Sequence, residues 1–140
     1  MEAERPTDDS QVAPQRLGDL QLAILDVLWE RGEALASEVY RALLPTRGLA
    51  PTTIATMLRK MEDRGLVVHR NEGRSFVYRP ALERDDVHRS MVGDLVERLF
   101  AGDPRELVNH LLSEGELALD DLDAIRRRIT RARRARGGEA

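Results

Sequence analysis

The apolar residues of this chain change their spacing partway along the sequence, and this change restricts the fold more than any other feature. In three early segments they recur every three or four positions, as on one face of a helix. The two runs 66–70 and 76–79, Leu-Val-Val-His-Arg and Phe-Val-Tyr-Arg, lose this helical spacing and are typical of short β-strands. The polar residues 71–75, which include Gly73, separate the two runs and indicate a hairpin turn.

Glycine and proline mark the ends of the three helical segments. The first segment ends before Gly32, and the second runs over residues 37–44 and is broken by Pro45. The third begins at Pro51, which suits the first turn of a helix because it has no N–H to leave unpaired, and ends at Gly65. Three helices followed by a two-stranded hairpin form the winged helix-turn-helix pattern. We therefore expect a mainly α fold with a small β-hairpin.

The sequence divides into three parts. Residues 1–16 are polar, contain two prolines and show no periodicity, so we expect a flexible N-terminal arm. We expect the winged-helix domain over residues 17–82 and a helical region over residues 83–140. The apolar stripes of this last part have too little of their own to pack on, and burying them against a second copy is the simplest solution. The expected dimerisation residues are Val87, Met91, Leu95, Leu99, Leu107, Leu111, Leu122, Ile125 and Ile129.

Charge is segregated along the chain, although the net charge is only -3. Residues 45–80 contain seven basic and three acidic side chains, whereas residues 81–125 contain four and twelve. A local basic patch matters more for phosphate binding than the charge of the whole chain. The basic stretch coincides with the third helix and the hairpin, and double-stranded DNA is therefore the expected partner.

The expected DNA-binding residues lie on the outward side of the third helix and on the hairpin. In a helix-turn-helix the second helix of the pair enters the major groove. Threonine hydroxyls can bond a phosphate or a base edge, and arginine and lysine can reach guanine or the backbone. Three threonines are poor choices for an ordinary solvated helix surface, because their helix propensity is low. The set is Thr52, Thr53, Thr56, Arg59 and Lys60 on the helix, with Arg70, Arg74 and Ser75 on the hairpin.

Other classes of site find little support in the sequence. The chain has no cysteine, which excludes disulfides and thiolate metal sites and suits a reducing cytoplasm. Its three histidines, His69, His88 and His110, are not at metal-ligand spacing. No serine lies in a nucleophile-elbow context, and no glycine loop would cradle a phosphate. We expect no enzyme activity, no cofactor, no membrane insertion and a cytoplasmic location. The arginine-rich tail runs from Arg126 to Arg136. We expect its positive charges to interact favourably with the dipole at the helix C-terminus and with acidic side chains of the second copy in a dimer.

These segments together resemble the BlaI/MecI family of penicillinase repressors, from about Leu17 to Ile129. The stretch Leu20 to Trp29 is similar to the family's first helix, with its tryptophan near the end. The stretch Leu49 to Leu58 is similar to the recognition-helix signature, in which Thr53 and Thr56 match the paired threonines. Gly65-Leu66-Val67 and Tyr78 match the entry and exit of the wing.

The resemblance implies a homodimeric repressor that binds a palindromic operator of the TACA…TGTA type. In one branch of the family a membrane sensor protease leads to cleavage of the repressor at an Asn-Phe bond. Here His110 and Leu111 occupy the matching positions, a departure from that pattern. A copper-responsive branch uses C-terminal cysteines, which this chain lacks.

Two alternatives remain open at the level of sequence. The fold could serve as a protein-interaction module, which an acidic total charge permits. It could also be a one-component regulator with a small ligand bound near Trp29, Met91, Leu95 and Leu99, although no inward polar groups accompany these residues.

Overall fold

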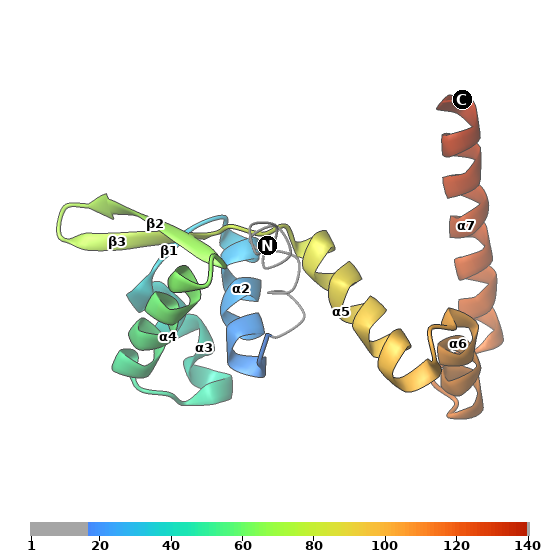
Figure 1. Ribbon diagram of the computed structural model, residues 1–140, viewed down its shortest axis with the longest axis horizontal. Coiled ribbons are helices and arrows are strands. Elements are labelled where there is room, and N and C mark those ends of the chain that lie inside the picture. Colours follow the sequence, from blue (N-terminus) through green and yellow to red (C-terminus); the bar gives the residue numbers. More distant parts are fainter. Residues whose placement is uncertain (1–16, 140) are drawn as a thin grey trace, which may run out of the picture. The chain divides into compact units, whose positions relative to one another are not determined.

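The computed structural model describes residues 17–139, so the expected N-terminal arm lies outside the described part of the chain. Helices and a small sheet make up the described residues, as the sequence predicts (Figure 1). None of these helices is long and apolar enough to cross a bilayer. In chain order the elements are α2 (Asp19–Arg31), β1 (Ala34–Leu35), α3 (Ala36–Arg47), α4 (Pro51–Asp63), β2 (Val67–Glu72), β3 (Ser75–Pro80), α5 (Arg84–Phe100), α6 (Pro104–Ser113) and α7 (Leu119–Glu139).

One aliphatic core holds α2, α3, α4 and the sheet together. Ile54, Leu58 and Met61 recur at helical spacing on α4 and are at most 1% exposed. They meet Ile24, Leu25 and Leu28 of α2, and the side chains of α3 and the strands complete the cluster. Burying a side chain of this size stabilises the fold by about 1.5–3 kcal/mol. The inward and outward faces of α4 are therefore fixed by this core.

The sheet has three antiparallel strands in the order β1-β3-β2, one more than the predicted hairpin. Strand β1 has two residues, and its Ala34 pairs with Tyr78 of β3. The hairpin is tighter than predicted, because Glu72 pairs with Ser75 and leaves a two-residue turn. Gly73 occupies the first position of that turn with φ +63°, a conformation that glycine adopts without steric cost. In Figure 1 the hairpin extends beyond α3 and α4, as a wing does.

Two helices continue past the predicted ends. Helix α3 includes Pro45 and stops at Arg47, with Gly48 left-handed just beyond it, so the predicted break at Pro45 was wrong. A proline near the end of a helix removes one backbone hydrogen bond and leaves the helix only a few residues to continue. Helix α7 continues through the arginine-rich tail to Glu139.

The single tryptophan ties the segment after the sheet to α2. The indole N–H of Trp29 donates to the carbonyl oxygen of Leu82 at 2.8 Å. The guanidinium carbon of Arg84 lies 5.6 Å from the centre of the Trp29 ring, a cation–π distance. The His88 ring stands at 90° to the indole, with centroids 6.0 Å apart. The sequence suggested Trp29 as part of a pocket for a small ligand. In the structure its ring instead contacts residues of its own chain.

The chain forms two compact units, one up to Asp94 and one from Leu95 onward. Within the described residues of the second unit, Val96 is the one buried hydrophobic side chain, at 8% exposed. Seven large apolar side chains of that unit are exposed by 39–76%: Leu95, Leu99, Val108, Leu112, Leu119, Ile125 and Ile129.

Candidate nucleic-acid interface

Helix α4 presents a polar outer face that is free of carboxylates over its first turns. Pro51 is its first residue, and no acidic residue lies in its first turn. Thr52, Thr53 and Thr56 are exposed, because the inward positions are held by the core. Backbone N–H groups at a helix N-terminus favour anions. The start of α4 is therefore suited to approach a phosphate backbone.

Four of the predicted DNA-binding residues line one shallow hollow on this face. Thr52, Thr53, Thr56 and Lys60 surround it, together with the side chain of Met57, and its volume is about 270 Å³. Three hydroxyls and one ammonium group thus lie close together on a single helix. This combination offers hydrogen bonds to base edges and to phosphate, with the threonine methyls available to a thymine methyl.

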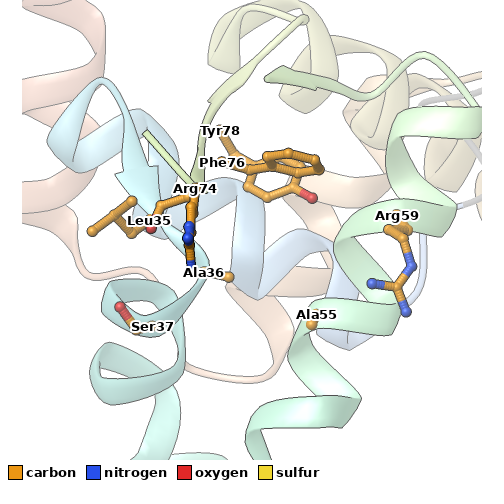
Figure 2. Close-up of a pocket in the computed structure, with 9 residues that line it drawn as sticks. Leu35, Ala36, Ser37, Ala55, Arg59, Arg74, Phe76 and Tyr78 are labelled. Carbon is orange, nitrogen blue, oxygen red and sulfur yellow. The ribbon is translucent and has the colours of Figure 1, made fainter. Parts of the chain in front are cut away.

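Three more of the predicted DNA-binding residues line a groove between α4 and the hairpin. The volume of this groove is about 320 Å³. Arg59 enters from α4, whereas Arg74 and Ser75 belong to the tip of the hairpin. Figure 2 shows Arg59 on one side of this groove, with Arg74 and the start of α3 facing it. Two guanidinium groups from separate elements therefore lie around one open space, an arrangement suited to a bridging anion such as a phosphate.

A hydrogen bond between α4 and β2 holds the hairpin beside the helix. Nδ1 of His69 lies 2.8 Å from both carboxylate oxygens of Glu62. Because a carboxylate only accepts, Nδ1 has to be the protonated nitrogen. The His69 ring also stacks on Phe76 of β3, with centroids 3.9 Å apart and planes at 14°. Helix α4 and both strands of the hairpin are connected through this one histidine.

Tyr78 lies beneath the same groove. It is 3% exposed, and this burial, with the nearby Glu62 carboxylate, raises its pKa above the ordinary value of 10.0. The positive charge of Arg59 partly offsets that rise in pKa. The phenol is therefore neutral wherever the protein would meet DNA.

Arg70 differs from the other basic residues of the predicted set. It lies next to His69 in β2, and neighbouring strand residues point to opposite faces. Its guanidinium donates to Glu33 at 2.8 Å and to Glu72 at 2.6 Å. Both hydrogen bonds raise the pKa of Arg70, and the two carboxylates balance its charge. The structure thus places Arg70 apart from the hollow and the groove that contain the other seven.

Sequence reasoning did not single out four residues that line the groove, which are Leu35, Ala36, Ser37 and Phe76. Ser37 stands in the first turn of α3, and Phe76 is 42% exposed on β3. A single aromatic residue in a short strand does not by itself indicate a binding site in the sequence. Ser37 is placed only by the packing of α3 against α4.

The predicted dimerisation residues differ in exposure. Leu95, Leu99, Ile125 and Ile129 are exposed by 40–68%, whereas Val87 is fully buried within its own chain. The remaining four, which are half-buried, are Met91, Leu107, Leu111 and Leu122.

His110 and Leu111, the positions that match the cleavage site of relatives, lie inside helix α6. Across residues 17–139, no three His, Asp or Glu side chains are grouped to hold a metal ion.

A three-helix unit with an exposed polar helix and an adjoining two-stranded wing defines the winged-helix class of DNA-binding proteins. Residues 17–131 match the family described as penicillinase repressor. The chain therefore belongs to the penicillinase repressor family, the BlaI/MecI group of bacterial winged-helix transcriptional repressors.

Two relatives agree with this assignment, and a solved structure shares the fold. The chain is 34% identical over 116 residues to the transcriptional regulator BlaI of Mycobacterium tuberculosis (strain ATCC 25618 / H37Rv), covering 81% of this chain and 83% of the relative. It is 26% identical over 110 residues to the penicillinase repressor of Bacillus licheniformis, covering 79% of this chain and 86% of the relative. A crystal structure of a possible transcriptional regulatory protein from Mycobacterium bovis (fragment 1–100) shares the fold. Its TM-score is 0.50 at 26% identity, and the match covers 70% of this chain and 99% of that one.

Proposed function

We propose that this chain represses transcription as a homodimer that binds a palindromic operator, with one α4 in the major groove of each half-site. The observation on which the proposal depends is the placement of seven predicted residues around one hollow and one groove. Thr52, Thr53, Thr56 and Lys60 face the bases and the nearby backbone. Arg59, Arg74 and Ser75 hold a phosphate between helix and wing.

A titration against duplex DNA at several salt concentrations tests this assignment. The probe is a duplex with a TACA…TGTA palindrome, compared with a shuffled duplex of equal composition. We expect Thr56→Ala to reduce the preference for the palindrome, by about 1–3 kcal/mol of discrimination if Thr56 makes a good base contact. We expect Arg59→Ala to weaken binding to both duplexes and to reduce the salt slope by about 0.9.

Two substitutions provide matched controls. Thr46→Ala removes an exposed threonine of α3 that bonds only its own helix, at 3.4 Å to the carbonyl oxygen of Leu43. Arg89→Ala removes an exposed arginine of α5 that pairs with Asp86. Both controls should bind DNA like the unmodified chain. Equal binding of the two duplexes, a flat salt dependence and silent Thr56 and Arg59 variants would contradict the proposal.

The homodimer is proposed from the exposed apolar side chains of the second unit. Soluble monomers rarely leave so many large apolar groups uncovered in so short a segment. A second copy would cover them and would place two recognition helices on one palindrome. Leu99 is the test position on α5, at 68% exposed, because a substitution there removes little from the fold of the single chain. We expect Leu99→Asp to sediment as a monomer with unchanged helix content, and a dimer of full stability would contradict the interface.

Release from DNA is proposed to occur through loss of this dimer, because each half-site alone binds weakly. A membrane sensor protease, the partner implied by the family resemblance, would achieve this by cutting between His110 and Leu111. Both residues lie inside α6, whereas proteases cut exposed, irregular segments most readily. Mass spectrometry of the chain from induced cells tests whether it is cut between His110 and Leu111. Fragments ending at His110 support cleavage, and an intact chain that has left the operator contradicts it.

A further inference from the structure

The second half of α7 contains an unusual concentration of positive charge. From Arg126 to Gly137 there are seven arginines and no acidic residue. All of these residues are exposed. None of the seven arginines is ion-paired with a side chain in residues 17–137. We call residues 126–137 the arginine segment.

The arginines surround the helix instead of forming one face. At about 100° per residue, the three consecutive arginines that open the segment already point in three directions. The other four, at 131, 133, 134 and 136, fill the intervening directions. Several of them stand three or four residues apart, where like charges repel and destabilise a helix. An anionic partner would relieve this repulsion.

The arrangement does not suit an apolar partner. Ile129 is the last large apolar residue of α7, and the apolar side chains that follow it within the segment are only those of Ala132 and Ala135. A helix that lies on a membrane has an apolar face opposite its basic one. The helix dipole attracts cations only near the last turn, so it does not account for Arg126, Arg127 and Arg128. Charge all around a thin helix fits a polyanion that runs alongside it.

We propose that the arginine segment binds the phosphate backbone of duplex DNA flanking the operator. The inference rests on the proposed function, because the winged-helix units hold the chain on DNA and raise the local concentration of phosphate near the segment. We expect the contacts to be independent of sequence, because guanidinium groups spread around a helix cannot all reach base edges in one groove, whereas contacts to phosphate carry no sequence information. Their contribution falls steeply with salt, because each neutralised phosphate releases counterions.

The test uses the full chain with Arg131, Arg133, Arg134 and Arg136 replaced by glutamine. The probe is a duplex of about 40 bp, about four turns of B-DNA, with the palindrome at its centre. A second duplex is trimmed to the palindrome. On the long duplex we expect the slope of log Kobs against log[salt] to become shallower by about 0.9 for each phosphate that the variant no longer neutralises. On the trimmed duplex we expect no change. A matched variant with lysine at the same four positions keeps the charge and should restore the slope.

Three outcomes would overturn the proposal. Equal slopes for the glutamine variant and the unmodified chain on the long duplex would show that the segment does not contact DNA. A glutamine variant that sediments as a monomer would show that the arginines bind the partner subunit instead. Arginine-dependent binding to single-stranded RNA without any effect on duplex DNA would assign the segment to another polyanion. In each case the unmodified chain would still prefer the palindrome, whereas failure of the proposed function would abolish that preference.

Discussion

Replacing Trp29 with phenylalanine tests how α2 is joined to the segment that leads from the wing into α5. The substitution keeps an aromatic ring in place and removes the indole N–H. That N–H donates to the carbonyl oxygen of Leu82 at 2.8 Å, a hydrogen bond with a net value of about 0.5–1.5 kcal/mol. The smaller ring also weakens the cation–π interaction with Arg84, which is worth about 0.5–1 kcal/mol at an exposed site.

The expected loss in free energy of unfolding is therefore about 1–2 kcal/mol. Urea unfolding followed by far-UV circular dichroism measures it, at one protein concentration for all variants so that the proposed association contributes equally to each. Arg84→Ala serves as a matched variant, since it removes the cation–π interaction and leaves the hydrogen bond. It should lose less stability than Trp29→Phe. A Trp29→Phe chain within about 0.5 kcal/mol of the original would refute the reasoning, because surface substitutions without a specific role have effects of that size.

Three further predictions concern the core, the wing and the buried phenol. Leu58→Ala should destabilise the chain by about 2–5 kcal/mol in the same urea assay, because Leu58 is fully buried; a smaller loss would mean that α4 is not anchored by this face. Arg74→Ala should weaken DNA binding more than Arg70→Ala, since Glu33 and Glu72 already engage Arg70; equal losses in the salt titration would contradict this. The pKa of Tyr78 is raised on folding, so its neutral form is the one that the fold favours. Its contribution to stability is complete below pH 10.0, the ordinary pKa, and is lost as the pH rises through the higher folded value. Tyr78→Phe should therefore lose less stability than the unmodified chain above that pH, and parallel pH profiles would argue against it.

Part of the interface could be predicted because it depends on local periodicity. The inward positions of α4 repeat every three or four residues, so Ile54 and Leu58 determine which threonines face outward. The hairpin was predictable for a similar reason, since two short runs rich in β-branched and aromatic residues, with Gly73 between them, are local signals. Ser37 and Phe76 were not predictable, because they line the groove only through the packing of α3 and β3 against α4.

Residue spacing was enough to predict where the helices of the winged-helix unit lie, apart from the end of α3, and which face of α4 points outward, and the separation of charge is visible in the sequence. These properties follow from residue spacing and composition, which need no knowledge of distant contacts. By contrast, the folded chain was needed to see that Arg70 pairs with Glu33, 37 residues away, while Arg74 lines the groove with Arg59. It also decided that Val87 is buried within its own chain, and that the two-residue strand β1 joins the sheet through backbone pairing, which leaves no side-chain pattern. Such features depend on which distant segments meet, and neighbouring residues in the sequence do not encode that.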